Sequence, residues 1–258
     1  MSTVSILVFA QFSDCHLYAD KEAIHYGHNV YQNLLAVLKD IETNDDIQFA
    51  VFTGDLSQDH SDESYVNFVA AIDESEISKP VYWLPGNHDS VEQMTKLLNH
   101  RNIYADKSLE FEELECLFLS SKSETPAGRV SAEELTRIEN ADTQKSTLIF
   151  MHHHPRPVGY FIDRHGLQEA DSFWHVVNQK SNILAIACGH VHRAMSIEKD
   201  TLNKAPLYTC PATSIQFDPE FDGVKALPSG PAYRQFSFEN KQLKTRVKQL
   251  PLAPLSVG

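Results

Sequence analysis

Apolar runs alternate with helix-period segments along most of the chain. Short runs rich in β-branched and aromatic residues predict buried strands, and apolar residues that recur every three to four positions predict helices. Strands are expected at 4–12, 47–53, 81–84, 147–151 and 183–188, with two strand-like pieces flanking 112–115. Helices are expected at 29–41, 62–72, 91–99 and 171–178. A further helix is expected to begin at Ser131, where Glu134 would complete a capping box.

The C-terminal part of the chain has a different pattern. After His192 it predicts shorter strands separated by turn residues, and no helix. Alternating strands and helices followed by a strand-rich tail are typical of a mixed sheet covered by helices. We therefore predict an α/β fold, a mixed two-sheet β-sandwich flanked by helices. The length of 258 residues suits one domain, spanning 1–258.

Composition narrows the classes of partner. The chain carries 22 Lys and Arg against 35 Asp and Glu, a net charge of −13, which disfavours a nucleic-acid polymer or an anionic membrane as the main partner. The four scattered cysteines contain no C-x-x-C pair, which fits a reducing compartment and excludes a Cys-built zinc site. Neither a signal-peptide pattern nor an apolar run of about 20 residues is present, so a soluble, cytoplasmic protein is expected.

Polar residues follow five of the expected strands. Because binding groups gather at the carboxyl ends of strands in α/β sheets, these clusters should converge on one crevice. In chain order they are Asp14-Cys15-His16, Gly54-Asp55, Gly86-Asn87-His88-Asp89, His152-His153-His154 and Gly189-His190-Val191-His192.

These residue types point to a metal site. Asp and neutral His are ligands for Zn, Fe, Mn or Co. In Asp14-x-His16 and His190-x-His192, side chains two positions apart in an extended segment point to the same side. Glycines before Asp55, Asn87 and His190 leave room for tight turns and close backbone approach. Since the candidate ligands are too many for one tetrahedral site, we predict two metal ions about 3.5–4 Å apart that share a carboxylate.

The same motifs resemble the signature of calcineurin-like metallophosphoesterases over about residues 6–247. Further segments are similar to bacterial class III 3′,5′-cyclic-AMP phosphodiesterases. They are GDLSQD (54–59), WLPGNHD (83–89), HHHPRPVG (152–159), CGHVH (188–192), PATSIQF (211–217) and GPAYR (230–234).

The resemblance implies a role for each ligand position. Two divalent ions of undetermined identity (Fe, Mn, Zn or Co) would be held, the first by Asp14, His16 and His192, and the second by Asn87, His152 and His190, with Asp55 bridging. The family pattern favours His152 as the ligand over His153 and His154. His88 would act on the leaving oxygen, and Asp89 would orient it. Substrate would contact His16, Asp55, Asn87, His88 and His192.

The implied reaction is hydrolysis of 3′,5′-cyclic AMP to 5′-AMP by a metal-bridging hydroxide. The alternative keeps the site but changes the substrate to another phosphodiester or phosphomonoester, such as a 2′,3′-cyclic nucleotide, a nucleotide or a lipid-linked diester. Pro85 stands where protein phosphatases of this superfamily carry an arginine, which disfavours that activity. A non-catalytic scaffold is the remote alternative, because no ligand position is lost. The expected assembly is a monomer or homodimer.

Several residues outside the motifs receive structural predictions. Phe161, His165, Phe173 and Trp174 could flank an adenine ring, although an ordinary packed loop is favoured. Cys15 is expected to fill the core, and Tyr233 and Arg234 to end a strand rather than reach a phosphate. The remaining histidines are expected at the surface or in satisfied loops, namely His25, His28, His60, His100, His165 and His175.

Overall fold

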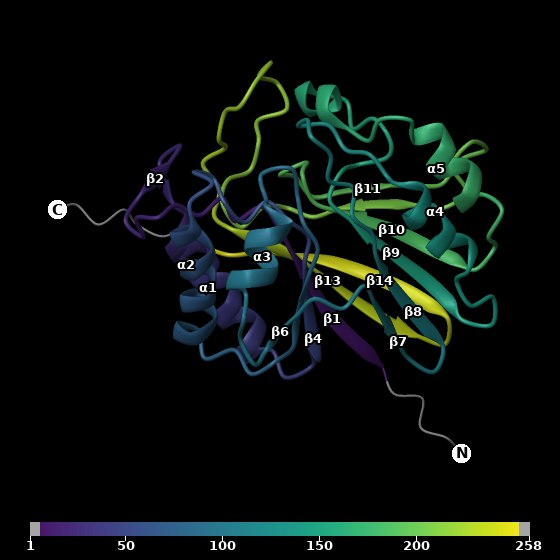
Figure 1. The fold of residues 1–258 in the computed structure, drawn as a ribbon, viewed down its shortest axis with the longest axis horizontal. Coiled ribbons are helices and arrows are strands. Elements are labelled where there is room, and N and C mark those ends of the chain that lie inside the picture. Colours follow the sequence, from purple (N-terminus) through teal and green to yellow (C-terminus); the bar gives the residue numbers. More distant parts are fainter. Residues whose placement is uncertain (1–5, 253–258) are drawn as a thin grey trace.

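The computed structural model describes residues 6–252, which build two mixed sheets that face each other (Figure 1). The first sheet has the order β14-β13-β1-β4-β5-β6 and the second β11-β12-β10-β9-β8-β7. The strands of the first sheet are β1 (Leu7–Phe12), β4 (Phe49–Phe52), β5 (Val81–Trp83), β6 (Ile103–Tyr104), β13 (Ala232–Glu239) and β14 (Gln242–Gln249). Those of the second are β7 (Ser108–Glu110), β8 (Leu114–Phe118), β9 (Ser146–Met151), β10 (Ile183–Cys188), β11 (Met195–Ile197) and β12 (Leu207–Thr209).

Helices cover the outer faces of the two sheets (Figure 1). On the first sheet they are α1 (Val30–Thr43), α2 (Asp62–Glu74) and α3 (Val91–Leu97), and on the second α4 (Ala132–Glu139) and α5 (Ala170–Val177). A short hairpin of β2 (Ile24–His25) and β3 (His28–Asn29) precedes α1, and a 3-10 helix η1 (Phe161–His165) precedes α5. The predicted two-sheet α/β architecture is confirmed.

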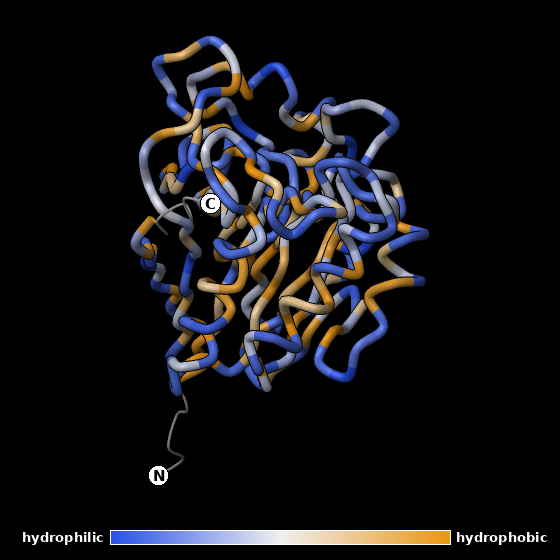
Figure 2. The backbone as a smooth tube through the Cα atoms, turned by 90° about the vertical axis from the view of Figure 1, so that its left-hand side faces the viewer, coloured by the Kyte–Doolittle hydropathy of each residue, from blue (hydrophilic) through white to orange (hydrophobic). Residues whose placement is uncertain are grey.

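An aromatic layer fills the space between the sheets. Phe9 on β1 stacks on Phe49 of β4 with ring centroids 4.9 Å apart, and on Phe236 of β13 at 5.4 Å. Phe150 of β9 reaches across from the second sheet and packs edge-on against Phe9. Removing one such buried ring costs about 3–5 kcal/mol, so this layer holds the sheets in register. Figure 2 shows many hydrophobic segments running through the body of the molecule, while most of the outer loops are hydrophilic.

Two local expectations need correction. The tail strands β13 and β14 are eight residues each, longer than any other strand among residues 6–252, because they pair with each other along their whole length. At α4 the hydroxyl of Ser131 accepts the amide of Glu134, but the carboxylate of Glu134 turns to the amide of Ser120 and to Arg137, so no reciprocal capping box forms. Residues 4 and 5 of the first expected strand lie outside the described residues.

The sheet topology determines where the polar motifs meet. Strands β1, β4 and β5 run parallel in the first sheet, as do β9 and β10 in the second. The loops after β1, β4 and β5 are tied together by backbone hydrogen bonds, such as Asp14 N–H to Gly54 O (2.9 Å) and Leu84 N–H to Phe52 O (3.1 Å). Side chains join the loops after β9 and β10 to them, since His152 Nδ1 lies 2.7 Å from the carbonyl oxygen of Thr53 and the amide of His190 donates to Asp14 Oδ1 at 3.1 Å. The expected convergence on one crevice is confirmed.

Candidate metal centre

Two groups of ligand-type side chains lie on either side of Asp55. In the first, His192 Nε2 is 3.3 Å from Asp14 Oδ1 and 3.1 Å from His16 Nε2. In the second, His152 Nε2 is 3.1 Å from Asn87 Oδ1 and 3.2 Å from His190 Nδ1. Asp55 Oδ2 lies between them, 3.7 Å from His16 Nε2 and 3.3 Å from His152 Nε2. The structure thus brings together all of the residues that the sequence proposed as ligands.

Backbone carbonyls orient two of the imidazole groups at this centre. His152 Nδ1 lies 2.7 Å from the carbonyl oxygen of Thr53, and His192 Nδ1 lies 2.9 Å from that of Ile215. A carbonyl can only accept, so each Nδ1 carries a hydrogen and each Nε2 points inward, where it can offer a lone pair to a metal ion once it is deprotonated. Backbone carbonyls fix metal-binding histidines in this way. The donor set therefore fits a divalent cation on each side of Asp55.

Burial and charge set the protonation of the ligands. Burial lowers the pKa of His16 and of His190 well below the ordinary range, which keeps both rings neutral. Burial also lowers the pKa of His152, but the negative charge of Asp55 outweighs it and raises that pKa to about 9. Conversely, His152 helps to hold the pKa of Asp55 well below its usual range, although burial opposes this. Without a cation, a proton between His152 and Asp55 supplies part of the positive charge that the carboxylates require.

The backbone at the ligands is strained. Five of them have left-handed φ values: Asp14 at 57°, His16 at 49°, Asp55 at 58°, His190 at 65° and His192 at 50°. Such a conformation costs on the order of 1–3 kcal/mol per residue and persists only where its surroundings enforce it. The predicted extended conformation of Asp14-x-His16 and His190-x-His192 is therefore wrong. Their side chains converge because both residues of each pair adopt the left-handed conformation.

Two glycines allow the ligand loops to approach one another. A Cβ atom on Gly86 would lie 2.2 Å from Asp55 Oδ1, and one on Gly189 would lie 2.1 Å from Ser13 Oγ. Both distances are too short for a real Cβ atom. At Gly86 the backbone nitrogen of Asp55 would also lie 2.4 Å away, so this position requires glycine, whereas at Gly189 the hydroxyl of Ser13 would have to move. The predicted close backbone approach before Asn87 and His190 is confirmed.

Asp89 supports the loops rather than His88. Its buried carboxylate accepts the amide N–H groups of Gly86, Asp55 and Leu56, each at 2.8 Å. Burial and the charge of Asp55 raise the pKa of Asp89, while these amides oppose the shift. The expectation that Asp89 orients His88 is corrected, because the carboxylate is already occupied in joining the β4 loop to the β5 loop.

His88 stands at the edge of the centre. Its amide N–H donates to Asp55 Oδ1 (2.9 Å), and its ring packs edge-on against His16 with centroids 4.8 Å apart. On its other side it stacks on His60 at 5.6 Å, whose Nδ1 donates to the carbonyl of His88 (3.0 Å). The imidazole of His88 faces the cleft described below and is held by three neighbours. It also lies close enough to His16 and Asp55 to form a third group of ligand-type side chains with them, although the sequence motifs do not place it among the ligands.

The two histidines that follow His152 hold loops. His153 Nδ1 is 2.8 Å from Ser121 Oγ and its Nε2 is 3.2 Å from the carbonyl oxygen of Pro126. His154 Nε2 is 3.2 Å from Asp163 Oδ1, which also accepts the amide of Val158. Both rings are therefore engaged with loop residues, which favours His152 as the ligand.

A solvent-open cleft of about 280 Å³ lies over the centre. Its polar floor is formed by candidate ligands together with His88. Its rim contains the residues His25, Tyr26, Gln58, Pro126, Phe161, Ile162, His165, Phe217 and Val224. We refer to this feature as the cleft.

The cleft changes several predictions about residues outside the motifs. His25 and His165 line it, and His28 is buried, so these three are not ordinary surface positions. Phe161 also lines the cleft, whereas Phe173 and Trp174 lie on the buried face of α5 and belong to the core.

Three other residues are accounted for by packing and hydrogen bonds. Cys15 lies in the core, Tyr233 donates to Asp40, and Arg234 is buried on the carbonyls of Thr209 and Met195. Sequence reasoning missed Tyr26 and Phe217. The second of these was within reach, since it ends the PATSIQF segment.

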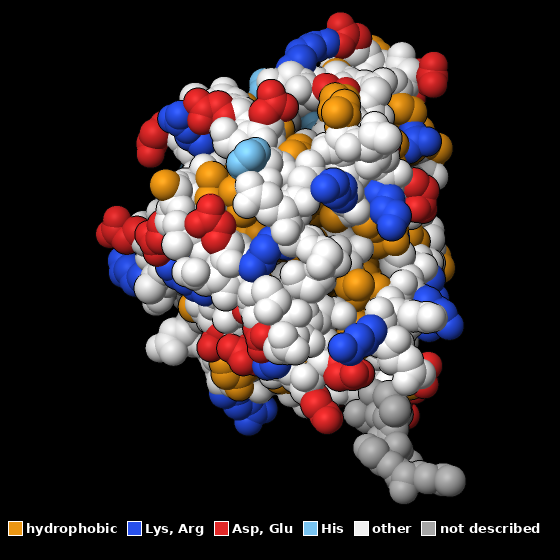
Figure 3. Space-filling model, turned by 90° about the vertical axis from the view of Figure 1, so that its right-hand side faces the viewer, with side chains coloured by type: hydrophobic (Ala, Val, Ile, Leu, Met, Phe, Trp, Pro, Cys, Tyr) orange, Lys and Arg blue, Asp and Glu red, His pale blue; other side chains and the backbone are white. Residues whose placement is uncertain are grey.

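Charge elsewhere on the surface is mixed. The face shown in Figure 3 carries Lys and Arg interspersed with Asp and Glu, without a continuous basic patch. Within residues 6–252, no helix is both long and apolar enough to cross a bilayer.

Comparisons with known proteins agree with this geometry. The family model described as calcineurin-like phosphoesterase matches residues 7–194. A probable cyclic nucleotide phosphodiesterase of Colwellia psychrerythraea is 47% identical over 250 residues, covering 95% of each chain. The 3′,5′-cyclic adenosine monophosphate phosphodiesterase CpdA of Escherichia coli K12 is 31% identical over 248 residues, covering 93% of this chain and 88% of the relative.

Solved structures support the fold. A dimetal phosphatase from Danio rerio superposes with a TM-score of 0.64 at 15% identity, covering 94% of this chain and 98% of that one. The fold family implies a pair of divalent metal ions, and the donor set described above fits them. From the family model and these relatives, the chain belongs to the calcineurin-like phosphoesterase family.

Proposed function

We propose that the protein is a metal-dependent phosphodiesterase that hydrolyses 3′,5′-cyclic AMP to 5′-AMP in the cleft. The observation that carries the proposal is the buried ligand set on both sides of Asp55, with imidazole lone pairs directed inward by backbone carbonyls. The substrate class is supported by the relatives, which are named as cyclic nucleotide phosphodiesterases.

Seven residues would hold the two ions. Asp14, His16 and His192 would bind the first, and Asn87, His152 and His190 the second, with Asp55 shared between them. When bound, two such ions lower the pKa of water and stabilise negative charge on a phosphate. The identity of the ions is left to the metals available, because Asp, Asn and His accept Fe, Mn, Zn or Co.

His88 would act on the leaving group. Breaking the bond between phosphorus and the ribose 3′ oxygen leaves negative charge on that oxygen. An imidazole at the edge of the centre can give that oxygen a proton or a hydrogen bond, which is worth about 10²–10⁴-fold in rate. The stacked ring of His60, and the hydrogen bond from the backbone amide of His88 to Asp55 Oδ1, fix the position of His88 for this role.

Asp89 would act as a positioning residue. By accepting amides from both the Asp55 loop and the Gly86 loop, it keeps the shared carboxylate and Asn87 at a fixed separation. The net charge of −13 and the mixed charge on the face shown in Figure 3 support a small substrate over a nucleic-acid polymer, since phosphate backbones are bound by clustered Lys and Arg.

A turnover assay tests the proposal. Protein loaded with Mn²⁺ is incubated with 3′,5′-cyclic AMP, and 5′-AMP is followed by chromatography. Asn87→Ala should abolish turnover, whereas Asn99→Ala, at an exposed position after α3, is the matched control. Bis(p-nitrophenyl) phosphate serves as a generic diester.

Each alternative has its own outcome. Hydrolysis of the generic diester without turnover of cyclic AMP would keep the metal centre and discard the substrate in favour of another phosphoester. Failure of both reactions in protein that retains two metal ions would contradict the enzymatic proposal and favour a binding scaffold.

A further inference from the structure

The β2–β3 hairpin carries a tyrosine in a conformation that tyrosine disfavours. Tyr26 (φ 48°) and Gly27 (φ 84°) are the two turn residues, and the flanking pair is His25 with His28. Two-residue hairpins with positive φ at both turn positions strongly prefer Asn-Gly, and a bulky residue at the first position is an outlier. Outliers of this kind cluster at functional sites.

The hairpin is fastened directly to the metal centre. The ring of His25 lies parallel to that of His16, with centroids 5.9 Å apart and planes 8° apart. His25 Nδ1 is also 2.8 Å from Tyr18 Oη. Tyr26 then packs edge-on against His25 at 4.8 Å. Tyr26 therefore contacts the candidate ligand His16 indirectly, through the ring of His25.

Packing does not explain the presence of this side chain. Tyr26 is 55% exposed, yet it lines the cleft. Tyr is less stable than Asn at this turn position because of the positive φ, and an exposed ring does not compensate for this cost by burying apolar surface. A ligand that covers the ring would restore that loss.

Other apolar side chains also lie on the rim of the cleft, beside the polar residues Gln58 and His165. Phe217 stacks on the candidate ligand His192 with centroids 4.0 Å apart and planes 4° apart, and Phe161 packs against Phe217 at 5.2 Å. Val224 lines the cleft while 38% exposed. Figure 1 shows the β2 hairpin and the long loop between β12 and β13 projecting at the same end of the molecule. A polar floor therefore lies beneath a rim to which three separate segments, the β2–β3 hairpin, η1 and the β12–β13 loop, contribute apolar side chains.

We infer that Tyr26 is a specificity-determining residue that stacks on the base of the substrate while the phosphodiester occupies the floor. The inference rests on the proposed function. A cyclic nucleotide has one charged group and one flat aromatic ring, joined by a rigid ribose. Its two ends match the polar floor and the aromatic rim of the cleft, and stacking of a base on an aromatic side chain tolerates many bases.

Two substrates that differ only in the base test this role. Protein loaded with Mn²⁺ is given 3′,5′-cyclic AMP or ribose 3′,5′-cyclic phosphate, and ring opening is followed by ³¹P NMR. Tyr26→Asn should lower the ratio of the two kcat/KM values by about 5–100-fold, mainly through KM for cyclic AMP. Asn favours this turn, so the hairpin is retained.

Other variants separate stacking from structure. Tyr26→Phe should restore the ratio, because it keeps the ring and removes only the hydroxyl. Tyr104→Asn removes an exposed aromatic residue from β6, which does not line the cleft, and should leave the ratio unchanged. As a readout independent of turnover, calorimetry should show that Tyr26→Asn loses the preference for 5′-AMP over ribose 5-phosphate.

The outcomes distinguish this inference from the proposed function. Suppose that wild-type protein turns over cyclic AMP and that Tyr26→Asn changes neither the ratio of the two kcat/KM values nor the preference for 5′-AMP over ribose 5-phosphate. The stacking role is then wrong and the proposed function stands. If wild-type protein hydrolyses neither cyclic compound, the proposed function fails and the stacking role fails with it.

Discussion

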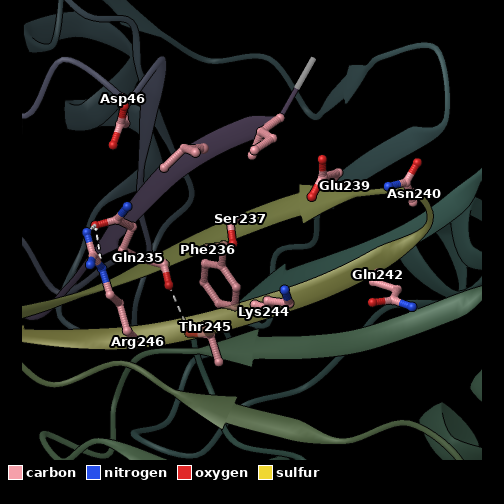
Figure 4. Close-up of a pocket in the computed structure, with 12 residues that line it drawn as sticks. Asp46, Gln235, Phe236, Ser237, Glu239, Asn240, Gln242, Lys244, Thr245 and Arg246 are labelled. Atoms are coloured by element: carbon pink, nitrogen blue, oxygen red, sulfur yellow. Dashed lines mark hydrogen bonds between the residues drawn. The ribbon is translucent and has the colours of Figure 1, made fainter. Parts of the chain in front are cut away.

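The cleft and a second, larger hollow on the same molecule differ in the burial of their polar side chains and in the strain of their backbone. The second hollow lies on the β13–β14 hairpin, not on the β2–β3 hairpin, and we call it the hairpin hollow. It is lined by β1, β13 and β14 and has a volume of about 470 Å³, against about 280 Å³ for the cleft. Figure 4 shows its polar contacts, including Arg246 bound to the side-chain oxygen of Gln235 and Thr245 bound to the backbone of Gln235. Among the described residues, no histidine or cysteine lines it.

The two regions differ in how much conformational stability is lost in forming them. Around the cleft, polar side chains such as Asp14 and His152 are fully buried, and five ligands hold left-handed backbone. In the hairpin hollow the charged residues Lys244 and Arg246 are exposed and lie on a regular strand. Buried polar groups and strained backbone cost stability, so they mark function better than the size of a cavity does.

Removing the shared carboxylate should have the largest effect. Asp55→Ala takes away the oxygen that lies between the two ligand groups, so we expect loss of bound metal and a fall in turnover of more than about 100-fold, since even indirect partners of a metal ligand are worth about 10–100-fold. Metal content by mass spectrometry and kcat/KM are the measurements. Asp46→Ala in the hairpin hollow is the control. If Asp55→Ala kept two metals and normal turnover, Asp55 would matter no more than Asp46, and the proposed functional difference between the cleft and the hairpin hollow would be contradicted.

Removing His88 should separate rate from metal binding. His88→Ala is expected to keep both metals and lower kcat by about 10²–10⁴-fold, because the imidazole acts on the leaving oxygen and belongs to neither ligand group. The matched control is His175→Ala, at an exposed position on α5. Loss of a metal ion in His88→Ala would show that the ring is a ligand.

Metal affinity should depend on pH through His152. Its pKa of about 9 means that the ring is protonated at neutral pH in the metal-free protein, and a metal must displace that proton. We therefore expect affinity to rise by up to about tenfold per pH unit as the pH approaches 9, and then to level off. Calorimetry in two buffers of different ionisation enthalpy measures the released proton. An affinity that is constant between about pH 6 and 9 would contradict this assignment.

The hairpin hollow should give the smallest effects. Arg246→Ala removes two hydrogen bonds to Gln235 from a partly solvated site, so we expect a loss of stability of about 0.5–1.5 kcal/mol and unchanged kcat/KM. Urea unfolding measures the first quantity and the turnover assay the second. A loss of turnover comparable with that of Asp55→Ala would show that the hollow takes part in catalysis.

The sequence predicted the elements of the site but not their mode of assembly. Strand-end motifs could be recognised because each ligand lies next to a buried strand, and the topology of parallel strands brings such ends together. The left-handed backbone of Asp14 and His190 could not be foreseen, since a positive φ is uncommon in any residue other than glycine, even though Asp and His adopt it more often than most. Asp89 was assigned to the wrong partner because its contacts with Gly86, Asp55 and Leu56 cross between two loops.

The rim was missed for a related reason. Tyr26 lies between two-residue strands that are too short to produce an alternating pattern. Its place over the cleft follows from the stacking of His25 on His16, a contact set by the folded chain. Sequence periodicity reports on burial within one element, whereas the rim depends on where separate loops meet.

Anomalous diffraction from crystals of the Mn²⁺-loaded protein tests the central claim most directly. We expect two peaks on opposite sides of Asp55, one contacting Asp14, His16 and His192, and the other contacting Asn87, His152 and His190. A single peak, or a second ion bound by His153 in place of His152, would contradict the account of this centre.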